Sequence, residues 1–234
     1  MGLNTGGGVY LGTPRTVGGG CHHAGMGLGE GTGEGMDGER WWGIVHDARA
    51  AVGARADDRD AADDRDAADD PLVEAVTERL ARLSPEDIVA FDVRYVAITD
   101  SAYRRPLWNA AYLIEGGCGD DGFMDFRAGL MLQGRAAFER AVADPDSLAD
   151  LPVVRRMGIE GRGWLGCEGF SYAARDAYRR ARGEAGTFDA AMEAALKRTA
   201  RPARPEGDDW DVEDEAETLR RLPRLAALFS GAES

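Results

Sequence analysis

The residues best suited to chemistry lie in the stretch 108–135, where two predicted helices meet at a Gly-Gly-Cys-Gly turn. Two adjacent aspartates open the second helix, and a third follows four residues later on the same helical face. Paired carboxylates beside arginine can perform general acid–base catalysis, because each carboxylate raises the pKa of its neighbour. The candidate catalytic residues are Cys118, Asp120, Asp121, Asp125, Arg127 and Arg135.

The same stretch allows other interpretations. Asp120, Asp121 and Asp125 could hold a divalent cation, and Cys118, just before a helix N-terminus, could be a nucleophile with a lowered pKa. Each residue type also has a structural use: aspartate caps a helix start, cysteine packs as a small residue, and Arg127 can pair with a carboxylate. We favour the structural interpretation and predict no metal and no cofactor.

Apart from Cys118, the histidines and cysteines lie at positions that do not suggest a catalytic or metal-binding site. His22 and His23 lie beside Cys21 in a glycine-rich segment, and His46 falls among the surface positions of the first predicted helix. The three cysteines are widely spaced and form no CxxC pair, which argues against a disulfide framework and against structural zinc. The N-terminus also lacks the pattern of a secretory signal, so we expect a cytoplasmic location.

Composition narrows the classes of partner. The chain has 234 residues, 44% of them hydrophobic, and a formal net charge of -14. This acidity argues against a nucleic-acid partner, and no apolar run is long enough to span a membrane. Much of the charge sits in two tracts: 55–70 has eight aspartates against three arginines, and 206–217 has eight acids and no base. Such tracts are more often solvated than functional.

Hydrophobic residues at helical spacing predict the elements that position the polar stretch. A helix over 107–114 is closed by two glycines, and a longer one runs from about Asp121 to Ala143. Residues 151–166 are interpreted as irregular. The other helices are expected over 38–53 with Asp37 as cap, from Asp70-Pro71, from Ser84-Pro85, and over 167–182 and 187–199. With no convincing strand, the fold class is all-α or mainly α.

We expect a single helical domain with loosely attached ends. Its parts are a disordered glycine-rich tail at 1–36, a helical domain at 37–200, an acidic linker at 201–217 and a C-terminal amphipathic helix at 218–230. The six-residue repeat over 57–68 has no apolar face and no calcium-loop spacing, so it is interpreted as a loop or a solvated helix extension.

The C-terminal region is the part most suggestive of binding. An aromatic residue among acids, followed by leucines at helical spacing, can dock into this domain or into another protein. The candidate partner-binding residues are Trp108, Trp210, Leu222 and Leu225.

Several motifs spread over about residues 38–180 occur together. They are Glu39-Arg40-Trp41-Trp42, Leu83 to Asp92, Leu107 to Ile114, Gly116 to Phe123, Phe126-Arg127, Gly134-Arg135 and Ala143 to Ala149. Together they resemble a bacterial family that is common in actinobacteria, the domain-of-unknown-function 4240 family. The family name supplies no activity, so the resemblance implies only that the stretch from the Gly-Gly-Cys turn to Arg135 is a distinctive surface.

Because the catalytic set is incomplete, we predict a non-enzymatic protein-interaction or regulatory module. Its partner is a protein, with no role for nucleic acid or membrane, and the oligomeric state is left open. The alternative is a small-molecule enzyme that uses the Asp/Arg/Cys cluster at the Gly-Gly-Cys turn for acid–base or metal-assisted chemistry.

Overall fold

The computed structural model describes residues 36–57 and 70–229. The predicted tail, the Cys21-His22-His23 cluster and nearly all of the aspartate-rich repeat lie outside these residues. The described chain is helical, and its only backbone pairing of the β type is one isolated bridge between Arg104 and Glu206. The predicted all-α class is confirmed. None of the described helices is long and apolar enough to cross a membrane.

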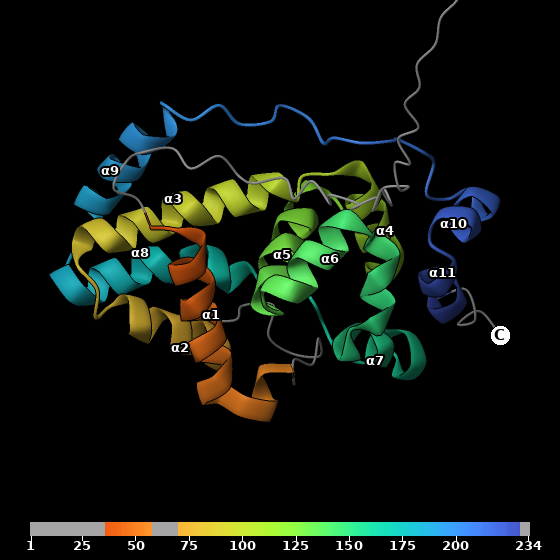
Figure 1. Cartoon of the computed structure of the whole chain (residues 1–234), viewed down its shortest axis with the longest axis horizontal. Coiled ribbons are helices and arrows are strands. Elements are labelled where there is room, and N and C mark those ends of the chain that lie inside the picture. The colour runs from red at the N-terminus through yellow and green to blue at the C-terminus, as the bar shows by residue number, and fades with distance from the viewer. Residues whose placement is uncertain (1–35, 58–69, 230–234) are drawn as a thin grey trace, which may run out of the picture. The chain divides into compact units, whose positions relative to one another are not determined.

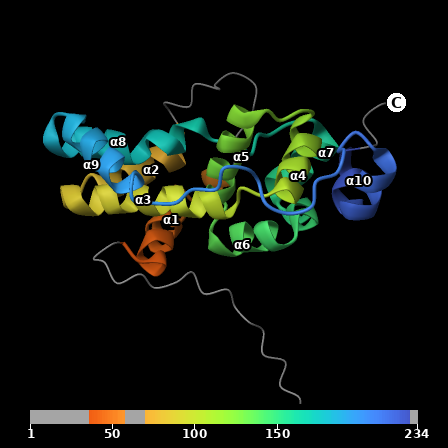
Figure 2. The same ribbon diagram turned by 90° about the horizontal axis from the view of Figure 1, so that it is seen from above.

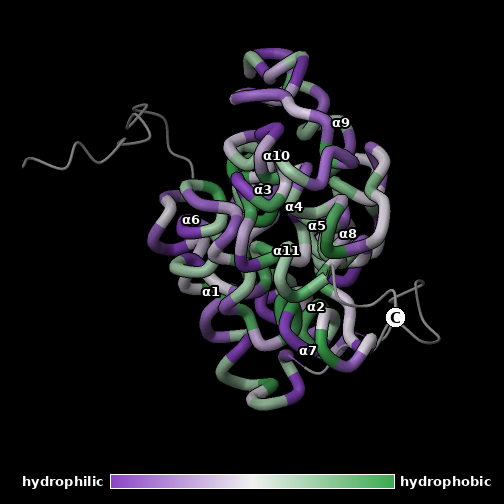
Figure 3. Tube along the Cα trace, turned by 90° about the vertical axis from the view of Figure 1, so that its right-hand side faces the viewer, coloured by the Kyte–Doolittle hydropathy of each residue, from purple (hydrophilic) through white to green (hydrophobic). Residues whose placement is uncertain are grey.

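Most of the helices follow one another with short connections, but a long extended stretch leads from the ninth α-helix to the tenth (Figures 1 and 2). Figure 3 shows hydrophobic and hydrophilic residues alternating along many of them, as expected where one face is buried. The elements are α1 (Gly38–Val52), η1 (Gly53–Asp57), α2 (Pro71–Leu80), α3 (Pro85–Ser101), α4 (Arg105–Glu115), α5 (Asp120–Leu132), α6 (Arg135–Ala143), η2 (Pro145–Asp150), α7 (Pro152–Glu160), α8 (Glu168–Arg182), α9 (Gly186–Leu196), α10 (Glu215–Arg221) and α11 (Pro223–Phe229).

The predicted start signals act as caps. The Asp37 carboxylate accepts the Arg40 N–H at 2.7 Å, and Asp70 accepts the Leu72 N–H at 2.7 Å. Ser84 accepts the N–H of the third residue of α3 at 3.1 Å. Each cap satisfies a donor that has no partner within its own helix, and contributes about 1 kcal/mol.

Two predictions of local structure are wrong. The expected helix over 121–143 is two helices, because Gly134 adopts φ +93°, a conformation that ends α5 and redirects the chain into α6. The stretch expected to be irregular contains α7, with Pro152 at its first turn and Gly161 as its left-handed cap. These residues mark the ends of a helix rather than its absence.

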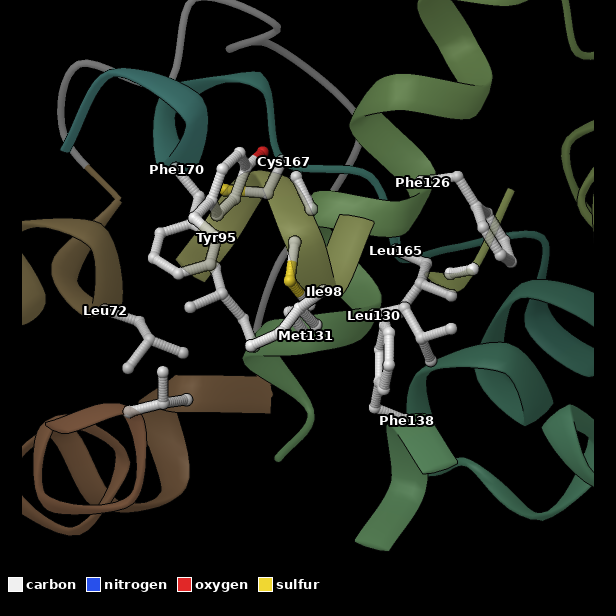
Figure 4. Close-up of a cluster of buried hydrophobic side chains, with 14 of the residues drawn as sticks. Leu72, Tyr95, Ile98, Phe126, Leu130, Met131, Phe138, Leu165, Cys167 and Phe170 are labelled. Atoms are coloured by element: carbon white, nitrogen blue, oxygen red, sulfur yellow. The ribbon is translucent and has the colours of Figure 1, made fainter. Parts of the chain in front are cut away.

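The core is built on aromatic residues from several helices. Trp41 is fully buried, its ring stacks on Phe91 with centroids 5.1 Å apart, and its indole N–H donates to the Phe91 carbonyl. Around it, α8 packs against α2, α3 and α5. Figure 4 shows Tyr95 and Phe170 meeting within this cluster, where their rings form an edge-on pair 5.4 Å apart.

The closest crossing in the core is between α5 and the segment that leads into α8. A Cβ atom on Gly129 would lie 1.7 Å from the Leu165 carbonyl oxygen. Two residues further on, the Cys167 N–H donates to the Asp125 carbonyl at 2.9 Å. The backbone of residues 165–167 therefore lies directly on α5, and only glycine fits at the crossing.

We expect Gly129→Ala to destabilise the protein by more than about 3 kcal/mol, because the new methyl group meets backbone that cannot rotate away. Gly43→Ala in α1 is the matched control. Its Cβ would meet nothing within 4 Å, so it should stabilise by roughly 0.5–1 kcal/mol through helix propensity. Urea unfolding of both variants measures the difference, and equal midpoints would contradict the described crossing.

Candidate functional site

The turn between α4 and α5 is held by an aromatic side chain. Gly116 ends α4 in the left-handed conformation, with φ +68°. The Trp108 ring stacks on Phe123 with centroids 4.8 Å apart, and its indole N–H donates to the Cys118 carbonyl at 2.8 Å. Trp108 thus fixes the position of the turn, and the side chains that follow it stand on a defined scaffold.

Four carboxylates gather at this turn, and we call Glu115, Asp121, Asp125 and Glu168 the acidic corner. Burial raises the pKa of Glu115 to about 7, and one of its carboxylate oxygens is buried without a hydrogen-bond partner. Burial, with the charges of Glu168 and Asp121, raises the pKa of Asp125 to about 6. Sequence analysis did not single out Glu168, which the fold brings to α5 from the start of α8.

Cys118 lies beside the acidic corner but is not an activated thiol. Burial and the neighbouring Glu115 and Asp125 carboxylates raise its pKa to about 12. A nucleophilic cysteine needs the opposite shift, because the thiolate is the reactive form. The thiol therefore stays protonated, as a small, partly buried group.

Arg127 is turned into the protein interior. Its guanidinium donates to the carbonyls of Phe123 and Thr99, both at 3.1 Å, and lies over the rings of Phe123 and Tyr103. Burial lowers its pKa. Arg127 ties α5 to α3 and faces neither the acidic corner nor an open surface.

Arg135 is also engaged elsewhere. It stands at the start of α6, where it pairs with Glu139 at 2.7 Å and with Glu39 of α1. The fold therefore brings Cys118, Asp121 and Asp125 together and leaves Asp120 exposed at the first turn of α5. Neither arginine pairs with these carboxylates: Arg127 donates to carbonyls, and Arg135 pairs with Glu39 and Glu139. Over residues 36–57 and 70–229, no three His, Cys, Asp or Glu side chains are arranged to hold a metal ion.

A second polar constellation involves the C-terminal segment, defined here as residues 201–229. It leaves the end of α9 and runs past α3 and α4 as an extended chain (Figures 1 and 2). Arg201 pairs with Asp100 at 2.8 Å, and the Glu206 N–H donates to the Tyr103 carbonyl at 3.0 Å. The acidic tract thus lies along the body of the protein.

The segment ends in α10 and α11, with the break at Pro223. Helix α11 contacts α4, η2 and α7, and we call the surface formed by these three elements the docking face. Leu222 and Leu225 are buried, and Gly158 of α7 allows close approach: a Cβ there would lie 3.0 Å from the Leu228 carbonyl oxygen. The predicted partner-binding leucines are thus covered by the chain itself.

Two buried polar side chains of the docking face bind the main chain of this segment. The Asn109 amide, 6% exposed, donates to the Trp210 carbonyl at 3.0 Å. The Asp146 carboxylate, 7% exposed, accepts the N–H groups of Arg224 and Leu225, each at 3.0 Å. The sequence did not single out either residue, because each bonds main chain that lies more than seventy positions further along the chain.

The buried Glu115 makes stability depend on pH. Its pKa of about 7, against an ordinary 4.5, means that the folded state binds the proton more tightly. Stability therefore falls as pH rises from about 4.5 to 7, and the loss is complete above 7. We expect Glu115→Gln to raise stability at pH 8 by on the order of 2 kcal/mol, with no difference near pH 4.

Glu74→Gln is a control for which the expected change in stability with pH has the opposite sign. The hydrogen bond from Arg180 lowers the pKa of Glu74, so its stabilising contribution is present above pH 4.5 and is lost in acid. This variant should be less stable than the wild type at pH 8 and equal to it in acid. Thermal unfolding of both variants from about pH 3 to 8 tests the signs, and a Glu115→Gln variant that is less stable than the wild type at pH 8 would refute the raised pKa of Glu115.

Comparison with known proteins identifies a family but no activity. No curated protein and no solved structure matches the chain. A family model described as "Protein of unknown function (DUF4240)" matches residues 36–180, which include the turn, the whole acidic corner and the docking face, but not the C-terminal segment. The chain belongs to the domain-of-unknown-function 4240 family.

Proposed function

We propose that the protein is a non-enzymatic interaction module that binds a short segment of a partner protein on its docking face. The supporting observation is that Asn109 and Asp146, both buried, direct their hydrogen bonds to main-chain atoms of the C-terminal segment. The other buried polar side chains of the described chain bond carbonyls near them in sequence or within the helical core.

Main-chain recognition of this kind suits a peptide ligand. With the segment in place Asn109 and Asp146 are buried, and the main-chain groups of the segment supply the hydrogen bonds that burial would otherwise leave unmade. The covering helix buries leucines in the manner of an amphipathic helix bound in a groove. Because the C-terminal segment lies outside the matched region, we interpret it as the module's own bound ligand.

One polar group of the C-terminal segment finds no hydrogen-bond partner where the segment lies on the body. The Trp210 indole N–H is buried and has no hydrogen-bond partner within the described residues. An unsatisfied donor opposes burial and so favours exchange with a segment that fits better. The protonated thiol of Cys118 suits the reducing cytoplasm, where we place the protein.

The alternative of an enzyme at the acidic corner has less support. Acid–base chemistry on a small molecule would use a cation beside the carboxylates, but Arg127 and Arg135 bind other groups. A raised thiol pKa also removes Cys118 as nucleophile. No observation favours one substrate class.

We expect Leu225→Asp to expose the docking face and allow a peptide to bind in trans. Leu225 is 0% exposed, so a carboxylate at this position is incompatible with docking of α11. A fluorescent peptide of residues 206–229 should then bind the full-length variant at least tenfold more tightly than the wild type. In the wild type the tethered segment competes at an effective concentration on the order of millimolar. Fluorescence anisotropy measures both affinities.

Two further variants control this experiment. Leu219→Asp makes the same substitution at a leucine of α10 that is 59% exposed, so it should behave as the wild type. Adding Gly158→Val to Leu225→Asp should abolish binding, because the new side chain occupies the place of the Leu228 backbone. Absence of peptide binding to a Leu225→Asp chain with a native circular-dichroism spectrum would sink the proposal.

A further inference from the structure

We infer that the docking face selects a helix that begins at a proline, and that Asp146 makes this selection by accepting the helix's first free N–H groups. This inference rests on the proposed function and names the class of partner: a segment with an apolar residue, a proline, a variable residue, an apolar residue and a small residue. In the bound C-terminal segment these are Leu222 to Ala226.

Asp146 is placed to bind a helix start. Its Oδ1 accepts the N–H groups of Arg224 and Leu225, and its Oδ2 lies 3.2 Å from the Arg224 nitrogen. These are the second and third residues of α11, whose N–H groups have no partner within their own helix. The carboxylate belongs to η2, more than seventy positions earlier in the chain. The contact therefore gives the buried carboxylate its hydrogen-bond donors and gives the two N–H groups their acceptor.

Proline at the first position complements this arrangement. Pro223 has no N–H, so the helix start presents only the two donors that Asp146 receives. Proline also disfavours helix in the residue before it, and Leu222 lies outside the helical region at φ -130° and ψ 54°. The break between α10 and α11 is thereby set before binding, which reduces the entropy lost on docking.

Apolar contacts supply the remaining selectivity. Leu222, Leu225 and Ala226 are buried, and Gly158 admits the last turn of the helix at close range. Arg224 lies between them in sequence but points outward, where it pairs with the exposed Asp150. Exposed ion pairs contribute little, so we assign the variable position to Arg224.

Peptides with single substitutions test the inference on the full-length Leu225→Asp chain. Relative to the 206–229 parent, Pro223→Ala in the peptide should weaken binding at least fivefold, and Arg224→Ala less than threefold. Adding Asp146→Ala to the protein should weaken binding of the parent at least tenfold, because two donors lose their acceptor. Adding Asp150→Ala is the matched control and should change affinity less than threefold.

The outcomes separate the two proposals. The inference is overturned if the parent peptide binds and the Pro223→Ala peptide binds with the same affinity. It is also overturned if the parent peptide binds the Asp146→Ala protein with unchanged affinity. Either result leaves the proposed function standing. A dominant effect of Arg224→Ala overturns it as well, because recognition would then run through the side chain. Failure of the parent peptide to bind overturns both. The peptide variants require no change in the protein fold, so a misfolded Asp146→Ala chain would not remove the test.

Discussion

Taking a polar group out of water costs free energy unless another group of the protein takes up its hydrogen bonds. In this protein that constraint fixes the direction of three buried polar side chains. Arg127 is buried and finds carbonyls on α3 and α5, so it joins two helices. Asn109 and Asp146 are equally buried, and their partners lie on the C-terminal segment. Arg127 thus bonds within the helical core, whereas Asn109 and Asp146 hold the main chain of that segment.

The acidic corner satisfies the same constraint by a different route. Glu115 and Asp125 have no ion pair within the described chain, and burial raises the pKa of each. Asp92 of α3 behaves similarly, with a pKa raised to about 7 by burial. Protonation relieves the burial of a carboxylate when no cation is near. Elsewhere exposed carboxylates such as Glu74 pair with arginine and have a lowered pKa. Within the acidic corner, Glu115 therefore keeps its proton to a higher pH than an exposed glutamate would, which reduces its repulsion with Asp125.

The sequence predicts what is local and misses what depends on distant contacts. Asp37, Asp70 and Ser84 act on donors two or three residues away, so their spacing identifies them as caps. The second half of α5 is buried on all sides, so periodicity could not tell that Arg127 points inward. Nor could it place Glu168 beside Asp125, or Asp146 beneath α11, since each pairing closes a long loop. Spacing placed Cys118, Asp121 and Asp125 near one turn, but it could not show that Arg127 and Arg135 bind groups on other helices.

The cost of taking charged groups out of water also explains how the acidic C-terminal segment lies on the body. Residues 206–217 carry eight acids and no base, and yet this stretch lies along the body. Its acidic side chains remain in water while its main chain makes the inward contacts at Glu206 and Trp210. Exposed pairs such as Arg105 with Asp209 add little, so the contact of the segment with the body rests on the buried Leu222 and Leu225 and on the bonds to Asp146. Burying acidic side chains would cost free energy, so an acidic stretch can lie along the body only where its main chain faces inward and its carboxylates face water.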